Sequence, residues 1–212
     1  MSFATFEKLP KDKKEYILST GIKEFSQKSY KDVSTDIITQ KCHISKGILF
    51  HYFGSKKKYY LYCLEKALER LTLTTKEDTV GGNDFYEILF ASMNRKISIC
   101  MQYKDEMHMV NMVSREVSVE IAQEKTEIIR RYLAGVQAES VQTIRRAVAT
   151  LNFKTEESNQ VTIEGLHIYI NAVLNKYLVQ YQQAPNEFFE NSEKIKAELK
   201  AYLDVMLYGL CK

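Results

Sequence analysis

The chain has 212 residues, a net charge of +3 and 45% hydrophobic residues, with only two prolines and eight glycines. So few breakers favour long helices over a strand-and-turn fold, and no apolar run is long enough to span a membrane. The N-terminus lacks a signal-peptide core and the four cysteines lack motif spacing. We therefore expect a cytoplasmic chain with reduced thiols, no metal site and no cofactor.

Positive charge is concentrated near the N-terminus. Residues 1–60 hold 12 lysines and no arginine against six acidic residues, whereas the remainder is mildly acidic. This distribution is expected if only the N-terminal quarter meets a polyanion such as DNA. The alternative is a lysine-rich solvated surface, and charge alone does not decide between the two.

A first helix begins near Pro10, where the missing N–H costs little. Its apolar residues recur at helical spacing and predict one buried face: Ile17, Leu18, Gly21, Ile22 and Phe25. Ser34 is then predicted to cap a short helix over 35–41 that buries Ile37 and Ile38.

A three-residue turn at 42–44 leads to a second short helix over 46–53, which Ser45 is predicted to cap and Gly54 to end. Leu49 and Phe53 are predicted to be buried, and the residues left exposed are Lys46, Gly47, Ile48 and His51. Ser55 caps the helix that follows. Two short helices joined by a tight turn form a helix-turn-helix, whose second helix enters the DNA major groove.

Residues 44–47, 49–53 and 55–56 (ISKG, LFHYF and SK) resemble the DNA-binding signature of tetracycline-repressor-like (TetR) transcriptional regulators. The resemblance covers roughly residues 10–65; beyond them the chain is similar only in helical character and length. The sequence departs from the family's usual Gly, Ala, Thr and Tyr at His43, Thr39, Ile48 and Phe50. Two of these departures, Ile48 and Phe50, remove hydroxyls that would contact DNA.

The motif predicts a set of DNA-contacting residues: Ser34, Thr35, Ser45, Lys46, Gly47, Ile48, Phe50, His51, Tyr52 and Lys56. Lys46 suits guanine O6 or N7, and His51 suits a base acceptor or a phosphate. The alternative for His51 is an ordinary exposed histidine. Lys56 stands at a helix N-terminus, where its ammonium and free backbone N–H groups can hold one phosphate.

The remaining pattern predicts further helices. One runs from Ser55 to about 73, a loop occupies 72–84, and others begin at Asp84, at Asp105, near 118 and at Thr155. Pro185 is predicted to end one helix, residues 186–191 to form a turn, and Ser192 to cap the last helix. Gly135 is expected to mark a close helix crossing or a kink. We expect an all-α fold of about nine helices, with a three-helix DNA-binding domain over 1–54 and a ligand-binding and dimerisation domain over 55–212.

The C-terminal domain carries two more predictions. Methionines and aromatic residues crowd into two successive helices, which suits a pocket for flexible apolar molecules, although an ordinary helical core is the alternative. The resemblance favours the pocket, and the residues assigned to it are Tyr86, Phe90, Met93, Met101, Tyr103, Met107, His108, Met112, Asn171 and Asn175. Apolar stripes at about 158–182 and 193–210 predict a homodimer.

Taken with these features, the resemblance implies a bacterial, nucleoid-associated regulator that binds double-stranded DNA and is released, as a repressor, by a small apolar or aromatic effector. The competing interpretation is a helical, dimeric interaction protein with only non-specific DNA binding, which His43, Ile48 and Phe50 leave open. No phosphate loop, metal-ligand spacing or nucleophile elbow is present in the sequence to indicate an enzyme.

Overall fold

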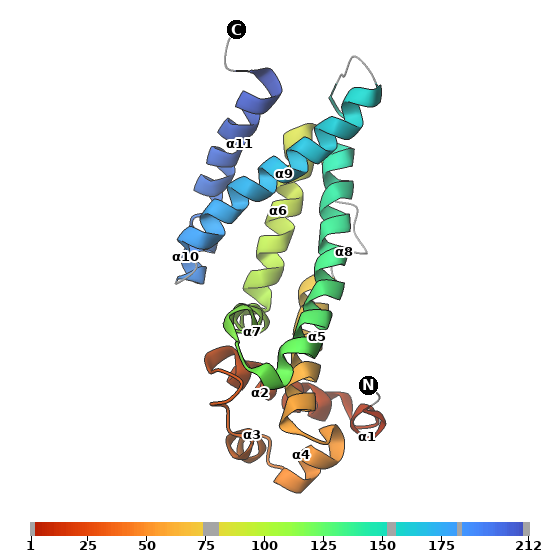
Figure 1. Ribbon diagram of the computed structural model, residues 1–212, viewed down its shortest axis with the longest axis vertical. Helices are drawn as coiled ribbons and strands as arrows, with labels where there is room; N and C mark the ends of the chain where they lie inside the picture. The colour runs from red at the N-terminus through yellow and green to blue at the C-terminus, as the bar shows by residue number, and fades with distance from the viewer. Residues whose placement is uncertain (1–2, 74–80, 152–155, 182–183, 210–212) are drawn as a thin grey trace. The chain divides into compact units, whose positions relative to one another are not determined.

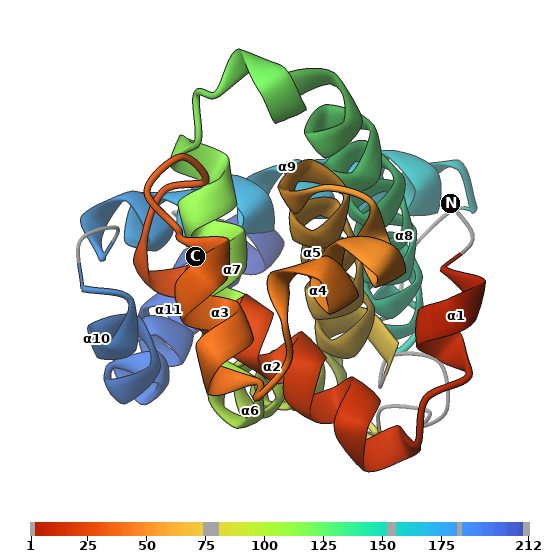
Figure 2. The same cartoon turned by 90° about the horizontal axis from the view of Figure 1, so that it is seen from below.

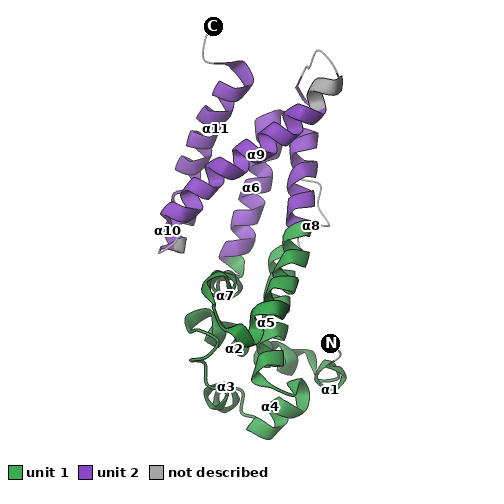
Figure 3. Ribbon diagram, viewed as in Figure 1, with its two compact units in different colours: residues 1–76, 102–135 green, residues 77–101, 136–212 purple. Residues whose placement is uncertain are grey.

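The computed structural model describes residues 3–73, 81–151, 156–181 and 184–209. Within these ranges every regular element is helical, with eleven α-helices and one short 3₁₀ helix (Figure 1). The chain divides into two compact units, residues 1–76 with 102–135 and residues 77–101 with 136–212 (Figure 3). The predicted all-α fold is confirmed.

The first unit contains the helix-turn-helix. Its elements are α1 (Ala4–Glu7), α2 (Lys11–Gln27), α3 (Thr35–Lys41), α4 (Lys46–Phe53), α5 (Lys56–Leu73), α7 (Lys104–Arg115), η1 (Val119–Ile121) and the first half of α8 (Ala122–Val148). Figure 2 shows this unit from below, with α3 and α4 toward the viewer. The predicted boundaries of α3 and α4 are confirmed.

Three serines fix the helix starts as predicted. The Ser34 hydroxyl accepts from the N–H of Asp36 and the Ser45 hydroxyl from that of Ile48, both at 3.2 Å. Ser55 accepts from the N–H of Lys58 at 3.2 Å. Each bond satisfies a backbone donor that the first helical turn leaves free. Gly54 ends α4 at φ 75°, a left-handed conformation that glycine adopts without a side-chain penalty.

The core of the first unit includes the predicted apolar face of α2 and the buried residues of α3, α4 and α5. Its deeply buried members include Ile17, Ile22, Phe25, Ile38, Leu49, Phe53, Tyr59 and Leu64. Arg70 on α5 adds a polar tie, because its guanidinium contacts Glu15 of α2 at 2.6 Å and Glu106 of α7 at 2.5 Å. These ion pairs and the shared core place α7 in the same unit as the helix-turn-helix, although the chain between them is long.

The second unit is formed by α6 (Phe85–Gln102), the remainder of α8, α9 (Glu156–Gln180), α10 (Pro185–Glu190) and α11 (Ser192–Tyr208). Asp84 caps α6 as predicted, accepting from the N–H of Glu87 at 2.9 Å. The fully or nearly fully buried core residues of this unit include Ile144, Val148, Leu166, Leu199 and Leu203. None of the described helices is long and apolar enough to cross a membrane.

Several local predictions were wrong. The four-residue α1 was not predicted, because one turn has too little periodicity to be recognised. Residues 186–191 were predicted as a turn, but α10 covers 185–190; Pro185 opens this helix at a position where proline needs no hydrogen-bond donor. Ser192 is the first residue of α11, and the preceding residue, Asn191, occupies its N-cap.

Two predictions about single residues also need correction. Ile37 is 37% exposed, because the seven-residue α3 turns only its Ile38 side into the core. Gly135 makes no close helix crossing, since a Cβ added there would meet no atom within 4 Å. The predicted cap at Thr155 lies outside the described residues, as do residues 74–80 of the predicted loop over 72–84.

Candidate nucleic-acid interface

The second helix of the motif, α4, separates a buried face from an exposed one. Leu49 and Phe53 are 0% and 1% exposed and anchor the helix in the core. The opposite face carries the exposed residues Lys46, Gly47, Ile48 and His51. A helix held by one side with an uncovered face on the other is the geometry that enters a major groove.

The turn before α4 is held from both ends. His43 adopts a left-handed conformation at φ 52°, which histidine tolerates better than most non-glycine residues. The N–H of Ile44 donates to the carbonyl of Thr39 at 3.1 Å. From α2, the hydroxyl of Tyr16 donates to the carbonyl of Lys41, the last residue of α3, at 3.1 Å. This tie fixes the end of α3, and the sequence did not indicate it.

Lys46 is already paired in the DNA-free protein. Its ammonium lies 3.0 Å from the carboxylate of Asp36 in α3, and both side chains are largely exposed. An exposed ion pair of this kind contributes about 0–1 kcal/mol. A base or phosphate can therefore replace Asp36 as the partner of Lys46 at little cost.

Lys56 has a different setting. Its Nζ donates to the carbonyl of Lys31 at 3.1 Å and lies 4.9 Å from the centroid of the Tyr30 ring. Burial lowers the pKa of Lys56, while the carboxylates of Glu120, Asp32 and Glu116 act in the opposite direction. The ammonium predicted to hold a phosphate thus has partners inside the protein.

The other predicted contacts occupy varied positions. Ser34 and Ser45 use their hydroxyls as helix caps, and Thr35 is buried at 7% exposure. Phe50 and Tyr52 are half-buried on α4. The structure brings the ten residues together around α3, α4 and the start of α5, and their contacts with DNA stay predictions.

The N-terminal residues support α4, which sequence reasoning missed. Phe6 of α1 is 1% exposed, and its ring centroid lies 4.7 Å from Phe53, 5.8 Å from Tyr52 and 5.5 Å from Tyr62. Phe3 adds a contact to Phe53 at 5.3 Å. The spacing of two phenylalanines three residues apart was the available signal for a buried helical turn. We conclude that α1 forms part of the wall behind the candidate interface.

The ten predicted ligand-binding residues divide between the two units. Tyr86, Phe90, Met93, Met101, Asn171 and Asn175 belong to the second unit, and Tyr103, Met107, His108 and Met112 to the first. Their environments also differ, since Met107 is buried whereas Met101 is 50% exposed. The hydroxyl of Tyr86 donates to Asp204, and the amide of Asn171 donates to its own helix at His167.

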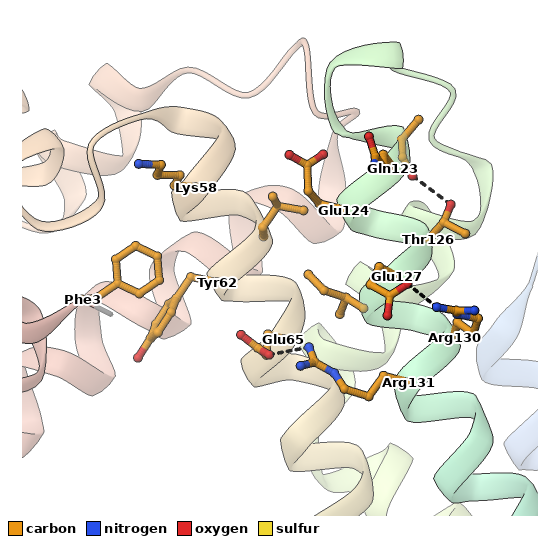
Figure 4. Close-up of a pocket in the computed structure, with 13 residues that line it drawn as sticks. Phe3, Lys58, Tyr62, Glu65, Gln123, Glu124, Thr126, Glu127, Arg130 and Arg131 are labelled. Atoms are coloured by element: carbon orange, nitrogen blue, oxygen red, sulfur yellow. Dashed lines mark hydrogen bonds and ion pairs between the residues drawn. The ribbon is translucent and has the colours of Figure 1, made fainter. Parts of the chain in front are cut away.

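A groove of about 910 Å³ lies within the first unit, between α5 and the start of α8 (Figure 4). Leu61, Tyr62 and Ile128 give it an apolar lining, with Phe3 at one side. Two ion pairs join α5 to α8, Lys57 with Glu124 and Glu65 with Arg131, each at 2.6 Å. In the sequence of α5, Lys57 precedes Leu61 and Glu65 follows it. None of the ten predicted ligand residues lines this groove, which arises from helices too far apart in sequence for a motif to reveal.

Metal-ligating residues are dispersed in the described part of the chain, where no group of three or more His, Cys, Asp or Glu residues is arranged to hold an ion. Cys42, Cys63 and Cys100 are free thiols, and Cys211 lies outside the described residues. Burial raises the pKa of the Cys42 thiol, which favours its unreactive protonated form.

Comparison with known proteins gives one family match. Residues 17–61 match the model for bacterial regulatory proteins of the tetR family. The chain is 38% identical over 74 residues to the HTH-type transcriptional regulator YuxN of Bacillus subtilis, a match covering 32% of this chain and 25% of YuxN. It is 24% identical over 203 residues to the regulator YerO of the same organism, covering 95% of this chain and 66% of YerO. The chain therefore spans a quarter of the first relative and just under two thirds of the second.

Among solved structures, the TetR family transcriptional regulator PfmR from Thermus thermophilus is similar with a TM-score of 0.56 and 20% identity. The similarity covers 92% of this chain and 99% of PfmR. At this identity the likeness establishes a shared helical fold.

Proposed function

We propose that this chain, which belongs to the tetR family of bacterial regulatory proteins, is a transcriptional regulator that binds double-stranded DNA through α4. The single observation that carries the proposal is the division of α4 between a fully buried anchor side and an exposed side bearing Lys46, Gly47 and His51. Both helices of the motif are capped, so the exposed side is presented on a fixed support. The surplus of six positive charges in residues 1–60 supports contact with phosphates.

The finer proposal is that the protein works as a homodimer. On α9 the exposed apolar residues Val161, Ile168 and Val179 recur at intervals of seven and eleven residues, which places them along one side of the helix. On α11 Val205, Met206 and Tyr208 are also exposed. Exposed apolar side chains gathered on two helices suit pairing with a second copy, within the predicted ranges 158–182 and 193–210. A two-fold dimer would present α4 to two DNA half-sites.

We also propose that the regulator is a repressor and that a small apolar or aromatic effector lowers its DNA affinity. The ten residues assigned to that effector, and the division between a DNA-binding domain over 1–54 and a regulatory domain over 55–212, stay predictions. The apolar lining of the groove between α5 and α8 supports a second place for such a molecule. Its coupling to DNA binding must be reciprocal, so bound operator should weaken effector binding by the same factor.

The experiment is a titration of the full chain with duplexes selected from a random library, each compared with a shuffled duplex at two salt concentrations. A specific regulator keeps its preference for the selected sequence as salt rises, because base contacts persist while phosphate contacts weaken. An interaction protein with diffuse DNA binding, which is the competing function, would lose affinity for both duplexes alike as salt rises. A protein that binds neither duplex at low salt is not a DNA-binding regulator.

A further inference from the structure

Tyr30 joins the helix-turn-helix to a distant corner of the same unit. It lies between α2 and α3 and is 3% exposed. Its backbone N–H donates to Glu116 Oε2 at 2.6 Å, and its hydroxyl donates to Glu120 Oε1 at 2.7 Å. Both acids belong to the corner that connects α7 to α8 through η1. Tyr30, which precedes the helix-turn-helix, therefore contacts two carboxylates that lie 86 and 90 residues further along the chain.

The ammonium of Lys56 lies over the face of the Tyr30 ring. The ammonium lies 4.9 Å from the ring centroid and is fixed there by its bond to the Lys31 carbonyl. An ammonium over an aromatic face is attracted by the electron-rich ring. Lys56 is therefore held beside Tyr30, whose polar ends both contact glutamates.

The two glutamates are fastened to different degrees. Glu116 is half-buried, and its other oxygen accepts from the N–H of Ser118 at 2.9 Å. Its carbonyl accepts from Lys125, so the corner is held at this point. Glu120 is exposed, and Tyr30 is the partner that its side chain contacts among the described residues. Glu120 is consequently the acid whose charge can be removed with least disturbance to the corner.

We propose that Glu116 and Glu120, both bonded to the Tyr30 whose ring holds Lys56, act as an internal counter-charge near this ammonium and weaken its contact with a DNA phosphate. This inference rests on the proposed function, because it concerns the same phosphate contact. Its consequence is that the α7–α8 corner weakens the affinity for all duplexes alike, without affecting the choice of sequence. Glu120 is in this view a positioning residue for Lys56, with no contact of its own to DNA.

The test compares Glu120→Gln with Glu127→Gln in the full chain. Glutamine keeps an oxygen that accepts from Tyr30 but carries no charge. Glu127 lies on α8 seven residues further along, roughly 10 Å, and pairs with Arg130. Removing the same charge there should change the field near Lys56 less, because Glu127 is not among the carboxylates that act on this ammonium. Glu120→Gln should tighten binding to selected and shuffled duplexes equally, by about two- to fivefold at low salt. The salt slope should steepen by up to about one unit, and Glu127→Gln should change neither quantity to this extent.

Dependence on Lys56 makes the test specific. In a Lys56→Gln background, Glu120→Gln should give no gain beyond that of Glu127→Gln, since the held charge is absent. An equal gain with and without Lys56 would overturn the inference and leave the proposed function intact. If the unaltered protein bound no duplex at all, the proposed function would be overturned as well.

A second readout needs no DNA. Because the Glu120 carboxylate favours the charged form of Lys56, Glu120→Gln should lower the pKa of that ammonium, followed by the NMR shift of its Cε. Glu127→Gln should leave the titration of Lys56 in place. An unchanged Lys56 titration in Glu120→Gln would show that the two groups do not interact.

Discussion

Tyr59 of α5 donates its hydroxyl to the carbonyl of Ile17 in α2 at 2.5 Å, in the centre of the first unit. The bond is possible because Gly21 leaves room for the ring. A Cβ added at Gly21 would lie 2.2 Å from the Tyr59 hydroxyl oxygen and 2.8 Å from the sulfur of Cys63. The close approach of α2 and α5 therefore depends on a glycine, which is the residue that sequence periodicity placed on the buried face.

Gly21→Ala should destabilise the protein by about 1–3 kcal/mol, because a methyl group has to be accommodated in a filled core. Gly135→Ala is the matched control, since its added Cβ meets no atom within 4 Å. In an exposed helix this change should stabilise by about 0.4–1 kcal/mol. Denaturant unfolding of both variants measures the contrast. Similar shifts for the two would show that α2 and α5 do not approach closely at this point.

Phe6→Ala should cost about 3–5 kcal/mol, because the ring is buried against three aromatic residues of α4 and α5. Phe3→Ala removes a half-buried ring from the same segment and should cost less. Denaturant midpoints give both values. If Phe6→Ala remained within about 0.5 kcal/mol of the unaltered protein, α1 would not be part of the wall behind α4.

Lys46→Ala and His51→Ala should reduce the preference for the selected duplex over the shuffled one, by about 1–3 kcal/mol for each lost base contact. Lys28→Ala removes an exposed charge outside the motif and should leave that preference unchanged. Affinities for both duplexes, measured at one salt concentration, supply the comparison. A loss of preference in Lys28→Ala as large as in Lys46→Ala would contradict the assignment of α4 as the reading helix.

Ile168→Asp should convert a dimer to a monomer, because it places a charge on an apolar helix face that is 69% exposed in one copy. Val119→Asp introduces the same charge at an 89% exposed position in the first unit and serves as the control. Light scattering at micromolar concentration reports the mass. A monomeric unaltered protein, or a dimeric Ile168→Asp variant, would argue against pairing through α9.

The helix boundaries and caps of the helix-turn-helix could be predicted because their signals are local. Ser34, Ser45 and Gly54 mark helix ends through bonds and backbone angles that each residue type favours in any context. Pro185 misled because proline follows some helices and opens others, and composition alone does not distinguish the two.

The parts that could not be predicted depend on distant contacts. Sequence reasoning placed Lys56 at a helix start, yet its partners Tyr30 and Lys31 belong to a loop fixed by Glu116 and Glu120. The groove between α5 and α8 likewise requires two helices whose proximity no motif encodes. The ligand residues were chosen by composition, and composition does not show that they divide between two units.

Sequence-specific binding in the major groove is tested most directly by protection of guanine N7 from methylation on the selected duplex, with the full chain bound. If the protein binds as a dimer and α4 of each copy reads the groove, guanines should be protected in two half-sites. These should lie about one helical turn apart, roughly 34–36 Å, or a multiple of it. Lys46→Ala should remove part of that protection at both half-sites. A bound complex in which no guanine is protected would contradict major-groove reading and would leave only phosphate contact.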